Sequence, residues 1–148
     1  MSHTHHTILL VEGTIADADF ARAAAARCQP AFNLQVFADV YAAIDYLAQT
    51  RIAAWPFIIL INLNLPKLDG LAAVRNLRIN PRTRDIPVLV YSRQFNQAEV
   101  LLSYSAGANS FVPKPQDEAE YLSLFASQMT YWLETRHWLF NRQEILHV

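Results

Sequence analysis

Short apolar runs alternate along the chain with longer stretches in which apolar residues recur at helical spacing. Runs such as 57–61 and 86–91 consist almost entirely of apolar residues, which is typical of parallel strands buried on both faces. The predicted strands are 8–11, 34–37, 57–61, 86–91 and 109–112. The predicted helices are 15–27, a helix capped by Asp39 that carries Val40 to Leu47, a helix from Gly70 that stops before Pro81, 97–105, and a long final helix from about Asp117.

This alternation of strands and helices predicts an α/β fold. Strands separated by helices form a parallel sheet with right-handed crossovers and helices on both faces. We therefore expect a doubly wound five-stranded parallel sheet in the order 2-1-3-4-5, with an extended C-terminal helix. The 148-residue chain has the size of one domain. We place that domain at 7–134, between a disordered N-terminal tail at 1–6 and a C-terminal extension at 135–148.

The final predicted helix is more apolar than a helix that only docks on a sheet, which needs a single apolar stripe. We expect Leu122 and Phe125 in this helix to lie in the core. Because aromatic patches tend to mark interfaces, we also expect a partner surface. The residues assigned to this surface are Tyr104, Tyr121, Trp132 and Trp138, and packing against the sheet is an equal alternative for the two tryptophans. The same helix is a candidate homodimer interface.

The overall charge excludes some classes of partner. The net charge is −1 and no long run of lysine or arginine occurs, which argues against nucleic acid or an anionic membrane as the main partner. Cys28 is the single cysteine, so no intramolecular disulfide forms and a reducing compartment fits best. No apolar stretch is long enough to span a bilayer. We therefore expect a cytoplasmic protein.

Polar residues stand directly after several predicted strands. The first strand is followed by Glu12 and Gly13, the third by Asn62, the fourth by Ser92 and the fifth by Lys114. In a doubly wound sheet these strand ends surround one crevice, where such folds place their ligands. Each residue alone is a weak signal. An acid, an amide, a hydroxyl and an ammonium in this order together make a strong one.

At these residues the chain resembles the response-regulator receiver domain, the CheY-like family, over about residues 7–133. The matching segments are Ile8-Leu9-Leu10-Val11-Glu12, Leu63-Asn64-Leu65-Pro66-Lys67-Leu68-Asp69-Gly70, Pro87-Val88-Leu89-Val90-Tyr91-Ser92 and Gly107-Ala108-Asn109-Ser110-Phe111-Val112-Pro113-Lys114-Pro115. Receivers carry an acidic pair after the first strand, a phosphorylated aspartate after the third, Ser or Thr after the fourth and lysine after the fifth. The resemblance implies that Phe111 is the aromatic switch residue. The spacing is similar to that of small stand-alone receivers, including those that work with bacterial phytochrome kinases.

Two departures from the family pattern matter more than the matches. Asn62 stands in the place of the phosphoacceptor aspartate, and Gly13 in the place of the second acid of the metal-binding pair. Phosphoryl transfer depends on a positioned acceptor and on charge neutralisation by a metal ion. Magnesium is usually held by carboxylates and phosphate oxygens. We therefore expect no aspartyl phosphorylation, weak or absent Mg²⁺ binding, no cofactor and no enzymatic turnover.

The resulting interpretation is a degenerate single-domain response regulator, a pseudo-receiver. It is expected to act in two-component signalling by protein–protein interaction, with a histidine kinase or another response regulator as partner. Glu12, Gly13, Ser92 and Lys114 would then form a vestigial active site, with Lys114 bonded to Glu12 or to the Asn62 carbonyl. Two alternatives stay open. One is a receiver that still responds to phosphate through unusual chemistry, and the other is a small-molecule sensor that uses the same crevice.

Overall fold

The computed structural model describes residues 6–29, 31–65 and 69–146, and side chains only as far as position 135, apart from Ala53. The strands are β1 (Thr7–Val11), β2 (Asn33–Phe37), β3 (Ile58–Ile61), β4 (Val88–Ser92) and β5 (Ser110–Pro113). The helices are α1 (Ile15–Arg27), α2 (Val40–Gln49), the 3-10 turn η1 (Ile52–Ala54), α3 (Gly70–Ile79), α4 (Gln97–Ala106) and α5 (Glu118–Leu146).

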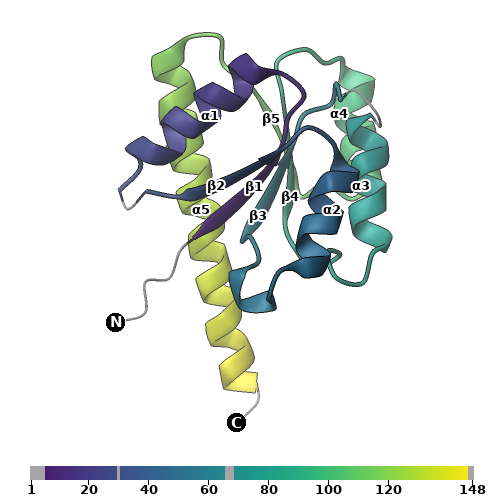
Figure 1. The fold of residues 1–148 in the computed structure, drawn as a ribbon, viewed down its shortest axis with the longest axis vertical. Coiled ribbons are helices and arrows are strands. Elements are labelled where there is room, and N and C mark those ends of the chain that lie inside the picture. Colours follow the sequence, from purple (N-terminus) through teal and green to yellow (C-terminus); the bar gives the residue numbers. More distant parts are fainter. Residues whose placement is uncertain (1–5, 30, 66–68, 147–148) are drawn as a thin grey trace.

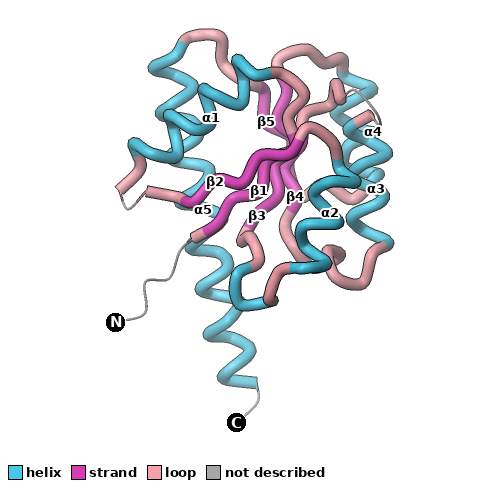
Figure 2. The backbone as a smooth tube through the Cα atoms, viewed as in Figure 1, coloured by secondary structure: helices cyan, strands magenta, loops and turns pink. Residues whose placement is uncertain are grey.

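The sheet is parallel throughout and has the order β2-β1-β3-β4-β5, which confirms the predicted fold. Helices α1 and α5 cover one face, and α2, α3 and α4 cover the other (Figure 1). Figure 2 shows the strands as one twisted layer between these helices. The chain therefore forms three layers, with the strands in the middle.

Residue parity along the strands creates two separate hydrophobic cores. In β1, Leu9 and Val11 pack on the α2–α3 side, while Ile8 and Leu10 pack on the α1–α5 side. Successive side chains of a strand point to opposite faces, so an unbroken apolar run is what a strand covered on both faces requires. The apolar runs of β1, β3 and β4 are fully buried, whereas the edge strand β2 is half-buried.

Local capping explains where several helices begin and end. The predicted cap Asp39 accepts a hydrogen bond from the backbone N–H of Ala42 (2.9 Å), and Asp69 does the same for Ala72 (2.9 Å). Gly107 ends α4 in the left-handed region, with φ 114°, where glycine has no Cβ penalty. Gly70 has a different role, because a Cβ there would lie 2.5 Å from the Asn62 carbonyl oxygen and 2.6 Å from the Leu63 Cα.

The structure continues without a break across both boundaries predicted for the domain, the one at residues 6 and 7 and the one at residues 134 and 135. His6, assigned to the tail, has a backbone carbonyl that accepts a hydrogen bond from Asn33 (2.9 Å), and its ring meets Phe57 edge-on at 6.5 Å. Helix α5 passes position 134 without a break and projects beyond the body of the fold (Figure 1). Within the described residues, no helix is both long and apolar enough to cross a membrane.

Candidate functional site

The strand ends converge as the sequence predicts. Val11 of β1 pairs with Ile61 of β3, so Glu12 and Asn62, the next residue of each strand, emerge side by side. On the other side of β3, Ser92 at the end of β4 pairs with Pro113 of β5. Glu12, Asn62, Ser92 and Lys114 are all at least nine-tenths buried. Gly13 is exposed and contributes no side chain.

The Asn62 side chain is held on both of its amide atoms. Its Nδ2 donates to Glu12 Oε1 (2.8 Å), and its Oδ1 accepts from the backbone N–H of Asn64 (3.3 Å). If position 62 carried a carboxylate, one of its negative oxygens would face Glu12 Oε1, where the N–H of Asn62 now donates a hydrogen bond, and the two oxygens would repel each other. The geometry around position 62 is therefore matched to an amide.

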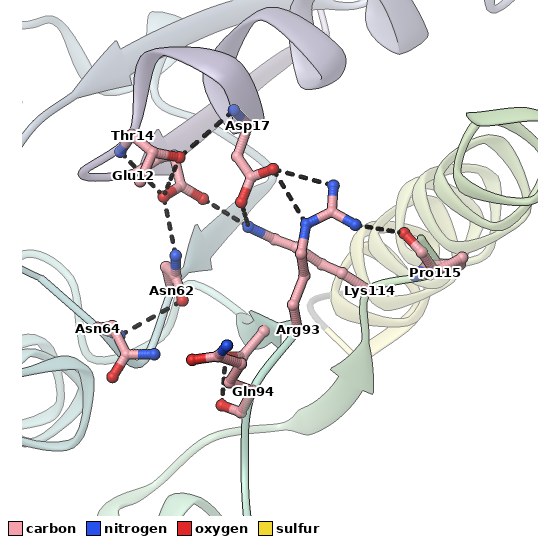
Figure 3. Close-up of polar contacts among 10 residues, drawn as sticks. Glu12, Thr14, Asp17, Asn62, Asn64, Arg93, Gln94, Lys114 and Pro115 are labelled. Atoms are coloured by element: carbon pink, nitrogen blue, oxygen red, sulfur yellow. Dashed lines mark hydrogen bonds and ion pairs between the residues drawn. The ribbon is translucent and has the colours of Figure 1, made fainter. Parts of the chain in front are cut away.

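Glu12, Asp17, Arg93 and Lys114 form one charged group, and Lys114 lies at its centre (Figure 3). Its ammonium donates to Glu12 Oε2 at 2.5 Å, with both side chains almost fully buried, and to Asp17 Oδ2 at 3.2 Å. Of the two partners expected for Lys114, the structure selects Glu12. The ammonium also lies 5.6 Å from the centre of the Tyr91 ring. A buried ammonium needs such partners, because burial of an unpaired charge is costly.

Sequence reasoning missed two members of this group, Asp17 and Arg93. Asp17 lies in the first turn of α1, where Thr14 caps the helix by accepting from the Asp17 N–H (3.4 Å). Arg93 follows β4 and donates to Asp17 Oδ1 through Nη2 (2.9 Å) and Nε (3.1 Å). Two signals in the sequence could have indicated the pair: an acid one turn after the vacant position 13, and an arginine directly after Ser92.

The electrostatics of Asp17 follow from these contacts. Burial raises the pKa of its carboxyl, but the hydrogen bonds from Arg93 and the charge of Lys114 outweigh burial, and the net pKa lies below the usual value. Asp17 is therefore ionised at neutral pH. Glu12 and Asp17 face one ammonium and one guanidinium, so the group carries as much positive as negative charge.

Every carboxylate oxygen in the group already accepts a hydrogen bond from the protein. Glu12 Oε1 is bonded by Asn62 and by the Thr14 N–H (3.3 Å), and Oε2 by Lys114. Asp17 Oδ1 is bonded by Arg93 and Oδ2 by Lys114. A divalent cation binds through such oxygens, and here it would have to displace the ammonium of Lys114 or the guanidinium of Arg93 from them, so this donor set does not fit one as it stands. In the described part of the chain, no group of three or more His, Cys, Asp or Glu side chains could hold a metal ion.

The remaining predicted site residues lie beside the group without joining it. The Ser92 hydroxyl is buried and donates to the carbonyl of Gln94 (3.0 Å). Phe111 is buried and meets Phe95 edge-on at 4.9 Å. Its backbone N–H donates to the hydroxyl of Tyr104 (3.1 Å), a residue whose side chain is otherwise about half exposed.

The expectation that Tyr121 lies on a partner surface is wrong. Tyr121 is 2% exposed and packs with Phe125 and Met129, which follow at four-residue spacing, in the core between α5 and the sheet. Trp132 is partly buried against the same core. Trp138 lies on α5, but its side chain falls outside the described residues. The part of α5 that faces outward instead includes Tyr131, which is 59% exposed.

Comparison with known proteins shows which family has the same order of strands. The family model of the response regulator receiver domain matches residues 8–126. Response regulator Rcp1 of Synechocystis sp. is 29% identical over 137 residues, which cover 90% of this chain and 93% of Rcp1.

Two solved structures have the same fold over most of their length. The phosphorylated cyanobacterial phytochrome response regulator RcpA superposes with a TM-score of 0.78 at 29% identity, covering 88% of this chain and 96% of RcpA. The Mn²⁺-bound form of Rcp1 superposes with a TM-score of 0.75, also at 29% identity, with the same coverage. By the matched family model, by the strand order and by the residues at the strand ends, this chain belongs to the response regulator receiver domain family.

Proposed function

We propose that this chain is a pseudo-receiver that acts in two-component signal transduction by binding other signalling proteins, independently of aspartyl phosphorylation. The observation that carries the proposal is the Asn62 side chain. It stands at the end of β3, where the family pattern places the phosphoacceptor, and its amide donates to Glu12 (2.8 Å). An amide nitrogen has a delocalised lone pair and is not a nucleophile.

The neighbouring groups support the same conclusion. Lys114 and Arg93 engage the carboxylates of Glu12 and Asp17, so neither of these two carboxylates is free to attack phosphorus or to act as a general base. We therefore propose that the domain has no turnover of its own and binds Mg²⁺ weakly at most. It would act in the cytoplasm as a binding module.

A surface on α4 is suited to a protein partner. Ser103 and Ala106 face inward, and the Ser103 hydroxyl donates to the carbonyl of Glu99 (2.7 Å). Leu101 and Tyr104 are 63% and 48% exposed. A helix that buries its small residues and exposes large apolar ones presents a contact surface, because exposed apolar patches tend to mark interfaces. The partner proposed here is a histidine kinase or another response regulator, and RcpA, a phytochrome response regulator, suggests a phytochrome-type kinase.

Helix α5 supports a second-order proposal of homodimerisation. Its outward face carries a shallow groove lined by small and polar residues between Ser123 and Glu134, with Tyr131 at its side. Small side chains allow another helix to approach closely. In this arrangement residues 7–134 form the receiver domain and 135–148 the extension, within which α5 continues as far as Leu146 and offers a longer helix to a second copy.

Amide NMR with Mg²⁺ and beryllofluoride, a phosphoryl mimic that bonds to an aspartate, tests the main proposal. We expect the wild-type spectrum to stay unchanged, because Asn62 offers no carboxylate and the acids are already paired. A double variant, Asn62→Asp with Gly13→Asp, serves as the control for a competent scaffold and is expected to respond at α4 and Phe111. A comparable response of the wild type would contradict the proposal and favour a receiver that uses unusual phosphate chemistry.

A further inference from the structure

Arg93 is held from four directions and is not a loose surface residue. Its guanidinium forms two hydrogen bonds with Asp17 of α1 and donates to the carbonyl of Pro115 (2.7 Å), beyond β5. It lies 5.7 Å from the Phe20 ring centre and 5.9 Å from that of Tyr121. Only a quarter of its side chain is exposed. Cation–π contacts of this kind add to an ion pair when solvent is excluded.

Arg93 supplies the second of the two positive charges that balance the acids of the crevice. A receiver with an acidic pair, an acceptor aspartate and one lysine has two negative charges in excess, which is the charge that one divalent cation neutralises. Here Glu12 and Asp17 are balanced by Lys114 and Arg93. The similar protein Rcp1 has a Mn²⁺-bound form, whereas the acids of this chain are paired with side chains of the protein.

We propose that Arg93 is a resident cation: it takes the place of the divalent ion in the charge balance of the crevice and thereby excludes divalent cations from it. Removal of its charge leaves Glu12 and Asp17 with Lys114 alone, and frees Asp17 Oδ1. The crevice then has one negative charge in excess and an oxygen available to a hard cation.

The same contacts of Arg93 also link three neighbouring segments of the chain. A metal ion leaves when its concentration falls, but Arg93 is covalently part of the segment after β4. Its bonds to Asp17 and Pro115 join that segment to α1 and to the β5–α5 connection (Figure 3). The segment leads through Phe95, which packs on Phe111, into α4. Arg93 thus holds the start of α4 in one arrangement whether or not metal is available.

A Mn²⁺ titration followed by electron paramagnetic resonance tests the proposal, because bound Mn²⁺ loses the sharp signal of the free ion. The test variant is Arg93→Met, which keeps an aliphatic stem over the Phe20 and Tyr121 rings and removes the charge. Arg93→Lys keeps the charge. The matched control is Arg22→Met, since Arg22 also pairs with an aspartate of α1, Asp19 (3.2 Å), but on the exposed surface.

We expect Arg93→Met to bind Mn²⁺ about tenfold more tightly than the wild type or better. Loss of the guanidinium leaves one uncompensated negative charge in the site and frees a carboxylate oxygen that can coordinate a hard cation. Arg93→Lys and Arg22→Met should behave as the wild type. Adding Glu12→Gln to Arg93→Met should remove the gain, which places the ion in the crevice. Thermal melts establish that each variant is folded, and Arg93→Gln replaces the methionine variant if that one does not fold.

Two results would overturn the proposal. Equal Mn²⁺ affinity in the wild type and Arg93→Met would show that Arg93 does not exclude the cation. A gain in Arg93→Met that survives Glu12→Gln would place the ion elsewhere. Neither result bears on the lack of a nucleophile at Asn62, so this proposal and the proposed function can fail separately.

Discussion

The Asn62→Asp substitution probes the chemistry of the crevice through stability alone. It replaces the N–H that Asn62 donates to Glu12 Oε1 at 2.8 Å by a second carboxylate oxygen. The position is 8% exposed, so water does little to screen the new repulsion. Lys114 offsets part of it, but its ammonium already serves both Glu12 and Asp17.

The cost has an upper bound, because the new carboxyl can take up a proton and then donate an O–H to Glu12. Protonating a carboxyl with an unfolded pKa of about 3.9 at about pH 7 costs roughly 4 kcal/mol, at 1.36 kcal/mol for each pH unit. Loss of a hydrogen bond to a charged group sets a lower figure of about 1.5 kcal/mol. We expect a loss of about 1.5–4 kcal/mol, or roughly 5–12 °C in Tm for a chain of this size.

The sign of the pH dependence distinguishes this mechanism from a simple packing defect. A carboxyl whose pKa is raised in the folded state binds more protons folded than unfolded, so its destabilising effect shrinks as the pH falls. At about pH 5 the bound on the cost falls to roughly 1.5 kcal/mol. Urea unfolding at both pH values, without divalent cations, measures the effect, with the exposed Asn64→Asp as the matched control. A variant as stable as the wild type at neutral pH, or a loss of stability independent of pH, would show that no repulsion between carboxylates arises at position 62.

Three further predictions concern other parts of the structure. Because the pKa of Asp17 is lowered in the folded state, its pairing stabilises the fold above the unfolded pKa of about 3.9 and loses this effect as the pH falls through the lower folded value. The stability difference between wild type and Asp17→Asn in urea melts should therefore shrink below about pH 4, and a constant difference would contradict the ion pair. Gly70→Ala should cost about 1–3 kcal/mol, because its Cβ would meet the backbone of Asn62 and Leu63 within 2.6 Å; an unchanged urea midpoint would disprove the close approach. Sedimentation velocity at high micromolar concentration should detect a dimer that Tyr131→Glu weakens. Tyr41→Glu should not weaken it, since Tyr41 is a similarly exposed tyrosine on α2, away from the proposed interface. A wild type that stays monomeric there would exclude dimerisation through α5.

The fold could be predicted because its main signals are local. Each unbroken apolar run reports a strand buried on both faces, and Asp39 and Gly107 mark helix ends through contacts within a few residues. The meeting of Glu12, Asn62 and Lys114 follows from strand order alone, since parallel strands deliver their last residues to one edge of the sheet.

The ion pair of Asp17 with Arg93 could not be predicted in the same way. Its partners are 76 residues apart, and Asp17 reaches the crevice only because α1 begins at Ile15 and turns its first carboxylate toward Lys114. The family pattern places the second acid at position 13, where this chain has glycine, and gives no reason to expect an acid of the site on the helix that follows.

The burial of Tyr121 cannot be predicted from the sequence, for a related reason. Apolar residues occur on more than one side of α5, so their spacing does not define which side faces the sheet. The register of the helix is set by the packing of Tyr121, Phe125 and Met129 against β4, β5 and α1. That packing leaves Tyr131, and not Tyr121, on the outside.

Intact mass after incubation with Mg²⁺ and a small-molecule phosphodonor shows whether the site at Asn62 still accepts a phosphoryl group. We expect no added phosphoryl group on the wild type, and one on the Asn62→Asp, Gly13→Asp double variant, which restores the acceptor and the acidic pair to the same scaffold. A phosphoryl group on the wild type would contradict the claim that this crevice has lost its acceptor chemistry.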